Sequence, residues 1–123
     1  RQLKPNEQPK HVYGCEVWRD LDWMNDDEKV LLECSKHKNI AWALSSVFDS
    51  QIIGGKRYDL AVEGRRAANA TFGRNVCDVY TGLNYAMDLT PLIKEQSIDI
   101  AEYVGGYIQR FYDSVNQTLK DLI

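Results

Sequence analysis

The sequence predicts a mixed α/β fold, because short stretches rich in β-forming residues alternate with longer segments of helical periodicity. The 123 residues suit one domain with its own core, since 44% are hydrophobic and 27% are charged. A long amphipathic pattern closes the sequence. We expect short strands, two middle helices and a long C-terminal helix.

The N-terminal quarter predicts a linker, a strand and a loop. Residues 1–9 are polar, contain two prolines and do not begin with methionine, which is typical of a linker in a piece of a longer protein. Residues 10–17 are rich in β-formers and predict a strand, whereas residues 18–28 hold several Asp and Asn and predict a loop. We therefore treat residues 10–123 as a single α/β domain or subdomain.

The next segment predicts a strand over residues 29–34 and then a helix that Ser35 caps. Five apolar residues with helical spacing would form one buried stripe on this helix: Ile40, Ala41, Leu44, Val47 and Phe48. Gly54 and Gly55 are expected to end it, because glycine adopts backbone angles that other residues resist.

A second middle helix is predicted over residues 60–72, with Asp59 as its cap and Gly73 near its end. Residues 80–92 then predict an extended segment, which the Thr-Pro pair at 90–91 closes.

The last helix is the clearest element of the sequence. Asp99 and Glu102 form a capping-box pair. Seven apolar residues at steps of four and three make one stripe: Ile100, Val104, Ile108, Phe111, Val115, Leu119 and Leu122. The two glycines at 105–106 each disfavour the helix by about 1 kcal/mol, so we expect a closely packed neighbour to compensate there.

Charge and hydropathy exclude several classes of function. The net charge of −3 creates no field that attracts phosphate backbones, so no nucleic-acid partner is expected. No apolar run approaches the ~20 residues of a membrane span, and no signal-peptide pattern opens the chain. We expect a cytoplasmic protein with no membrane partner.

Two histidines and two cysteines are candidates for a structural zinc site. His11 and Cys15 lie four residues apart on the predicted strand, so their side chains share a face. Cys34 and His37 form a C-x-x-H pair at the next junction, and together the four would complete a tetrahedral site. Their spacing matches no compact zinc-finger pattern. The alternative is two buried thiols and two surface histidines.

The segment YGCEVWRDLDW, residues 13–23, is the candidate substrate site. Its tryptophans offer flat apolar faces and its polar groups can bind hydroxyls, a mixture that suits a sugar-like ligand beside a strand end. The candidates are Glu16, Trp18, Arg19, Asp20, Asp22 and Trp23. The alternative is a tryptophan pair that fills the edge of the core, with Arg19 in an ion pair. The carboxylates would instead suit a glycoside hydrolase if two of them faced each other across a cleft.

Three blocks, VYGCEVWRDLDW, FDSQIIGGKRYDLAVEGRRAANATF and YAMDLTPLI, resemble the C-terminal portion of the PIG-L/LmbE family of zinc-dependent N-deacetylases. The similarity runs from about residue 10 to residue 111 and is closest to a bacterial branch with an E-V-W-R-D-L-D-W block. In that family a helix closes on Ser-Gln, here Ser50-Gln51, and a later helix bears Gly-Arg, here Gly64-Arg65.

The resemblance implies a Rossmann-like fold and a zinc-activated water that removes acetyl from an amino-sugar derivative. The family's A-H-P-D-D-E metal motif and its later histidine motif are absent from these 123 residues. The resemblance thus assigns no catalytic residue and no metal ligand to the chain, and it places zinc with the missing N-terminal part of the same protein. It adds four candidates for the pocket rim: Arg57, Tyr58, Arg65 and Arg66.

The chain is accordingly expected to be a substrate-pocket and structural portion of a deacetylase, without catalysis of its own. Its expected partners are an N-acetylated sugar-like molecule, the missing N-terminal part and, as family members often assemble, further copies of itself. The alternative function is a non-enzymatic interaction module that carries the structural zinc described above.

Overall fold

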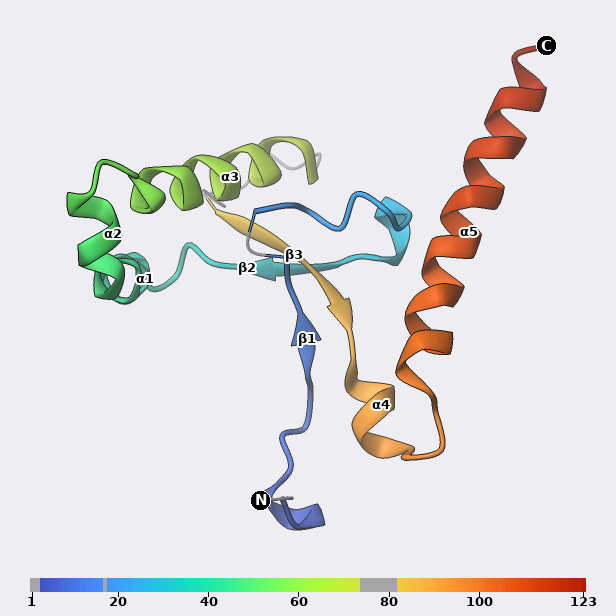
Figure 1. Ribbon diagram of the computed structural model, residues 1–123, viewed down its shortest axis with the longest axis horizontal. Helices are drawn as coiled ribbons and strands as arrows, with labels where there is room; N and C mark the ends of the chain where they lie inside the picture. Colours follow the sequence, from blue (N-terminus) through green and yellow to red (C-terminus); the bar gives the residue numbers. More distant parts are fainter. Residues whose placement is uncertain (1–2, 17, 74–81) are drawn as a thin grey trace. The chain divides into compact units, whose positions relative to one another are not determined.

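The computed structural model describes residues 3–16, 18–73 and 82–123, and it is a mixed α/β structure as predicted (Figure 1). The chain divides into two compact units. Unit 1 comprises Arg1–Val30 and Ala86–Ile123, and unit 2 comprises Leu31–Tyr85. Each unit is described by itself.

Three short strands form one sheet in the order β1-β3-β2: β1 (Tyr13–Gly14), β2 (Val30–Glu33) and β3 (Leu83–Asp88). β1 is antiparallel to β3, with Tyr13 opposite Asp88 and Gly14 opposite Met87. β2 confirms the strand predicted over residues 29–34. β3 falls inside the predicted extended segment 80–92, whose first two residues lie outside the described part.

The strand predicted over residues 10–17 is wrong in length, because only two of its residues join the ladder. Val12 bonds elsewhere: its N–H donates to Thr90 Oγ1 at 3.1 Å, and its carbonyl accepts from the Leu89 N–H at 2.8 Å. After Gly14 the chain turns into the polar loop. Val17, the last residue of the predicted strand, lies outside the described residues.

The core of unit 1 is a cluster of three buried side chains, Leu21, Met24 and Met87. Five partly buried residues pack around it: Trp23, Leu89, Tyr103, Val104 and Tyr107. The Tyr103 hydroxyl donates to the Asp88 carbonyl at 2.6 Å. Burial, followed by the bond to Tyr107, raises the pKa of Tyr103 well above its usual range. The cluster thus joins the polar loop, β3 and the start of the last helix.

The strand ends at Asp88 and the Thr-Pro pair at 90–91 then begins α4 (Thr90–Lys94), so residues 90–92 are helical and not extended as predicted. Proline suits the first turn of a helix because its missing N–H would have no partner there. The Thr90 N–H donates to Asp88 Oδ1 at 2.9 Å. Hydrogen bonds from the hydroxyl and from the N–H of Thr90 are the main causes that lower the pKa of Asp88.

The last helix, α5 (Ile100–Asp121), begins where predicted, since the Asp99 carboxylate accepts from the Glu102 N–H at 2.9 Å. Its apolar stripe is only partly covered. Val104 packs on the core of unit 1, whereas most of the stripe beyond it is exposed: Ile108, Val115, Leu119 and Leu122.

The packing neighbour expected at the two glycines of α5 is absent at Gly105. Nothing in the described part of the chain lies within 4 Å of the position that a Cβ would take there. At Gly106 the near atom is Arg110 Nη1, 3.1 Å from that position, on the same helix. The glycines therefore loosen α5 without a compensating contact from another element.

Unit 2 holds α1 (Lys38–Ser45), the single 3₁₀ turn η3 (Ser46–Phe48), α2 (Asp49–Ile53) and α3 (Tyr58–Gly73). α3 packs on both α1 and α2. The Asn69 side-chain amide donates to the Leu83 carbonyl at 3.2 Å, which ties α3 to β3. None of the helices in the described residues is long and apolar enough to cross a membrane.

Ser35 does not cap α1 as predicted, because its N–H and its hydroxyl both donate to the Glu33 carboxylate. The hydroxyl bond is the largest cause of a lowered pKa at Glu33. His37 takes the N-cap position of α1 instead, without a side-chain bond to the helix.

The single buried stripe predicted for the first middle helix is wrong. Ile40, Leu44 and Val47 are exposed, and only Ala41 is half-buried; the side chain of Phe48 lies outside the described part. Ile40 and Leu44 are exposed within α1 itself, and the 3₁₀ turn that follows takes only Val47 out of the α-helical periodicity.

The second middle helix begins two residues earlier than predicted, and Asp59 lies in its first turn instead of capping it. Asp59 is buried and accepts two bonds from the Arg57 guanidinium, at 3.0 and 2.7 Å. These bonds are the main reason why the pKa of Asp59 is lowered. Gly55 has a φ of 94°, as expected for a glycine that ends a helix.

We predict that Met24→Ala lowers the free energy of unfolding by about 2–5 kcal/mol, because it removes a fully buried side chain and leaves a cavity. Met24 is 1% exposed, whereas Leu122, the control, is 77% exposed. Leu122→Ala should change stability by less than about 0.5 kcal/mol. Urea unfolding measures both, and equal losses would contradict the described core.

We predict that acid destabilises the protein partly through Asp59. Its pKa is lower in the folded state than in the unfolded chain, where it is about 3.9. Its stabilising contribution is therefore present above that value and is lost as the pH falls through the folded pKa. In unfolding measured over a pH series, Asp59→Asn should flatten the acid limb. A loss of stability that is equal at every pH would count against the Arg57–Asp59 pair.

Candidate functional site

The carboxylate of Glu16 organises the polar loop of unit 1. Glu16 Oε2 accepts from the Leu21 N–H at 2.9 Å, and Oε1 accepts from Trp23 Nε1 at 3.0 Å. Both oxygens thus bind donors five and seven residues further along the chain. The bonds close residues 16–23 into a compact loop between β1 and β2.

Leu21 occupies an unusual backbone conformation in this loop. Its φ is 56°, in the left-handed region that disfavours a bulky side chain by roughly 1–2 kcal/mol. Two contacts hold it there: the Glu16 bond to its N–H and the burial of its side chain, which is 3% exposed. Strained residues of this kind cluster at functional sites, so the strain marks the loop as a candidate.

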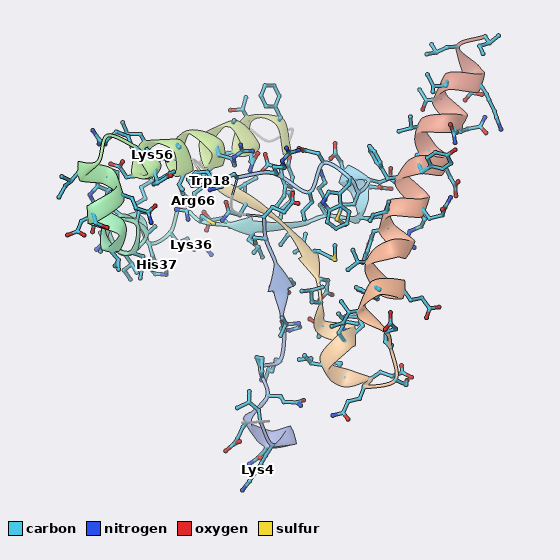
Figure 2. All side chains as sticks on the ribbon, in the orientation of Figure 1. Lys4, Trp18, Lys36, His37, Lys56 and Arg66 are labelled. Carbon is cyan, nitrogen blue, oxygen red and sulfur yellow. The ribbon has the colours of Figure 1, made fainter. Side chains whose placement is uncertain are left out.

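The loop separates the predicted site residues into two groups. Trp23 is half-buried, packs on the core of unit 1 and bonds to Glu16, so these two residues have a structural role whatever they bind. Trp18, which is labelled in Figure 2, is exposed, and so are Arg19 and Asp22. Asp20, the sixth candidate, is half-buried. Substrate binding by these residues remains a prediction, and the exposed three are best placed for it.

Glu16 does not support the glycoside hydrolase interpretation, in which it would act as an acid or a nucleophile. Both of its oxygens bind donors of the loop itself. A general acid or a nucleophile needs an oxygen directed at the scissile bond, so Asp20 and Asp22 would have to supply that chemistry.

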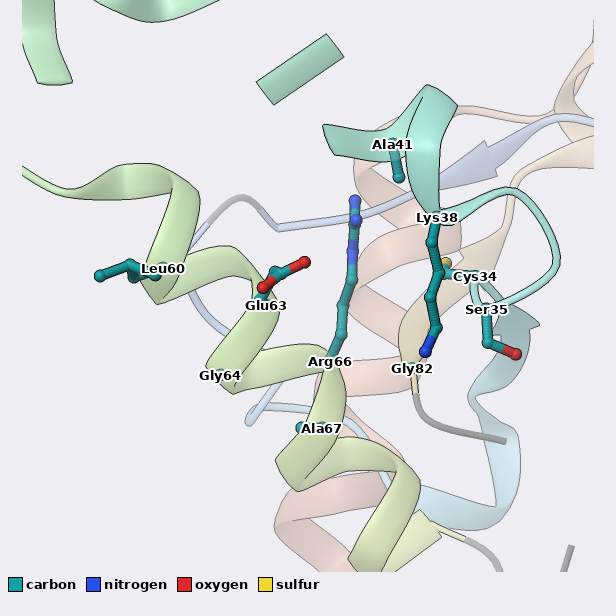
Figure 3. Close-up of a pocket in the computed structure, with 10 residues that line it drawn as sticks. All are labelled: Cys34, Ser35, Lys38, Ala41, Leu60, Glu63, Gly64, Arg66, Ala67 and Gly82. Atoms are coloured by element: carbon teal, nitrogen blue, oxygen red, sulfur yellow. The ribbon is translucent and has the colours of Figure 1, made fainter. Parts of the chain in front are cut away.

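Unit 2 contains a pocket of about 390 Å³ between α1, α3 and the end of β2 (Figure 3). Arg66 of α3 extends across it toward Ala41 of α1, while Lys38 of α1 extends beside it toward Gly82. The Glu63 carboxylate points into the same space. The pocket thus gathers charged groups from two helices.

Arg66 carries an unsatisfied donor. Its Nε is buried without a hydrogen-bond partner, and it is the one buried side-chain nitrogen or oxygen in the described part with none. Leaving such a group unpaired costs about 1–3 kcal/mol, and more for a charged donor. This cost sets the pocket apart from an ordinary surface hollow.

The other rim candidates have neighbours of their own. Arg57 forms the two-bond pair with Asp59, which raises the pKa of the guanidinium further. Tyr58 and Arg65 are half-buried on α3. These residues and Arg66 belong to unit 2 and the polar loop belongs to unit 1, so a rim that unites both sets remains a prediction.

The candidate zinc ligands are divided in the same way. His11 and Cys15 belong to unit 1, and Cys34 and His37 belong to unit 2. Across residues 3–16, 18–73 and 82–123, no group of three or more His, Cys, Asp or Glu could hold a metal ion. The His11 ring instead stacks on Tyr13, with centroids 6.0 Å apart. The structural zinc site therefore gains no support from the described residues and remains a prediction.

Sequence reasoning named Arg66 but missed Lys38 and Glu63. Glu63 and Arg66 lie three residues apart on α3 and so share a face, a signal that the sequence contains. Lys38 reaches the pocket only because α1 packs on α3. No local pattern in the sequence predicts that contact between α1 and α3.

Comparison of the chain with protein-family models, curated proteins and solved structures finds no match. The resemblance to the deacetylase family therefore rests on the three sequence blocks and remains a prediction.

We predict that Glu16→Gln lowers the free energy of unfolding by about 1–3 kcal/mol, because the new NH₂ group would face a donor instead of accepting from it. The near-UV circular dichroism of the tryptophans should weaken as the Trp23 indole loses its partner. Asp22→Asn, in the exposed part of the loop, is the control and should leave both signals unchanged. An intact spectrum in Glu16→Gln would show that Glu16 does not hold the loop.

Proposed function

We propose that this chain is the C-terminal portion of a cytoplasmic zinc-dependent N-deacetylase of the PIG-L/LmbE type, with the Rossmann-like fold of that family. It supplies one wall of the substrate pocket and structural support, while the metal ligands belong to the missing N-terminal part. The substrate is an amino-sugar derivative that carries an N-acetyl group.

The observation that carries the proposal is that some residues of the loop stabilise it while others are exposed and available to a ligand. Glu16 and Trp23 hold the loop from inside, and Trp18 remains 45% exposed beside Arg19. An indole face packs on the apolar face of a sugar ring, while a guanidinium and a carboxylate, here Asp22, bind its hydroxyls. A rigid loop with this exposed chemistry suits sugar recognition.

Exposed apolar faces support the idea that further polypeptide covers this chain. In unit 2, large apolar side chains are exposed on α2 and α3, most strongly at Ile53 and Phe72. In unit 1, the C-terminal half of the α5 stripe is exposed. The α5 residues share one helical stripe, and contiguous apolar surface of this kind marks an interaction surface. It would equally suit the alternative function, a non-enzymatic interaction module.

In the proposed enzyme, residues of the N-terminal part would hold a zinc ion, which would supply an activated water for hydrolysis of the acetamide. The residues of this chain position the sugar. Stacking on Trp18 fixes the plane of the ring, and polar contacts from Arg19 and Asp22 fix its rotation, which brings the acetamide into line with the attacking water.

We predict that the complete reading frame contains an A-H-P-D-D-E segment upstream of this chain. The protein that it encodes should bind stoichiometric zinc and release acetate from an N-acetylglucosamine derivative. Elemental analysis of the present chain alone should show no stoichiometric zinc, whereas an interaction module with a structural zinc would retain it. A complete frame without the motif would contradict the proposal.

We predict that Trp18→Ala in the complete enzyme lowers kcat/KM about three- to tenfold, because a stacking contact contributes roughly 0.5–1.5 kcal/mol. Trp42→Ala is the matched control, since Trp42 is 46% exposed and Trp18 is 45% exposed. The control should leave the kinetics unchanged. Unchanged kinetics in Trp18→Ala, with a lower melting temperature, would assign Trp18 a structural role only.

A further inference from the structure

We infer that the pocket of unit 2 binds a compact oxyanion, the carboxylate or phosphate group of a small molecule, through Arg66 and Lys38. This inference does not rest on the proposed function. It concerns a pocket built entirely within unit 2, and it would hold for an enzyme or for an interaction module.

Arg66 offers a buried hydrogen-bond donor to a ligand in the pocket. A guanidinium carries five N–H groups in a planar fork, and the Nε–H side of that fork is one of the two edges that grip an oxyanion with paired bonds. In Arg66 this Nε is buried and has no partner. An oxyanion in the pocket would supply the missing acceptor together with the opposite charge.

The residues that line the pocket carry more positive than negative charge. Lys38 brings a second cation from α1: its side chain runs along that of Arg66 in the opposite direction, so that its ammonium lies toward Gly82 and the Arg66 guanidinium lies toward Ala41 (Figure 3). Glu63 is the one carboxylate among the residues that line the pocket. No ion pair joins it to either cation in the described part of unit 2. The lining therefore has a net positive charge available to a ligand.

The N-terminus of α1 lies at the pocket, because Lys38 is both its first residue and part of the lining. α1 begins at Lys38, and in the described residues no side chain caps its N-terminus. The first amides of a helix carry a partial positive charge and favour an anion. This effect adds to the two side chains and does not replace them.

The size of the pocket limits the ligand. A volume of about 390 Å³ lies at the lower end of the range for small-molecule sites. The space exceeds that of a single inorganic ion, so the oxyanion would be one group of a larger molecule. Ala41, Leu60 and Ala67 offer apolar surface for the rest of it.

The test is a titration of the ¹⁵N-labelled chain with inorganic phosphate and, separately, with acetate, followed by NMR. The Nε–H signal of Arg66 is a direct probe, because a new acceptor moves its proton resonance downfield. A shift with phosphate alone identifies a phosphate site, and a shift with acetate alone identifies a carboxylate site. A shift with both identifies a general oxyanion site. Absence of a saturable shift with either probe at millimolar concentrations overturns the inference.

Variants separate binding from folding. Arg66→Gln and Lys38→Gln should each weaken binding about tenfold or more, measured from the backbone amide of Gly82. Glu63→Gln should tighten binding, because it removes the one negative charge from the lining. A merely structural role for these residues predicts no such gain.

Lys36→Gln is the matched control, because it removes a cation close in sequence to the pocket without changing its lining. This variant should bind the probes like the unmodified chain. Equal weakening in the control and in the pocket variants would show a nonspecific charge effect and overturn the inference. If Arg66→Gln fails to fold, Lys38→Gln and Glu63→Gln still decide the question through their opposite directions.

Discussion

The paired hydrogen bonds of the Glu16 carboxylate are the constraint on which unit 1 depends. They draw the Leu21 N–H and the Trp23 indole toward one point, which turns the chain out of β1 and into a loop. The turn forces Leu21 into the left-handed region, and the cost is offset because its side chain joins Met24 and Met87 in the core. The same turn leaves Trp18 exposed. A single carboxylate thus links backbone strain, core packing and the exposed candidate site.

Elements with strong local signals could be predicted from the sequence. The start of α5 follows from Asp99, which caps the helix with its own side chain, and β2 follows from a short apolar run between polar residues. The length of β1 could not be predicted, because Val12 finds its partner in Thr90, 78 residues further along the chain. The apolar stripe predicted after Ser35 is wrong because apolar spacing alone does not decide which face of a helix is covered: Ile40 and Leu44 are exposed within α1, and Val47 follows in a 3₁₀ turn.

The candidate site shows the same division. Composition was enough to select the loop, because indoles, carboxylates and a guanidinium crowd into residues 13–23. Composition could not show that Glu16 and Trp23 bind each other and so differ in role from Trp18. In unit 2, Arg66 was named from the family resemblance. That its Nε is buried without a partner is a property of the folded unit, in which α3 packs on α1, and the sequence does not show it.

We propose that the exposed indole of Trp18 contacts an N-acetylated sugar. The most direct measurement is the indole Nε–H spectrum of the complete ¹⁵N-labelled protein during titration with N-acetylglucosamine. The claim predicts a saturable shift of the Trp18 signal, while the equally exposed indole of Trp42 stays in place. A Trp18 signal that does not move, or one that moves no more than that of Trp42, would contradict it.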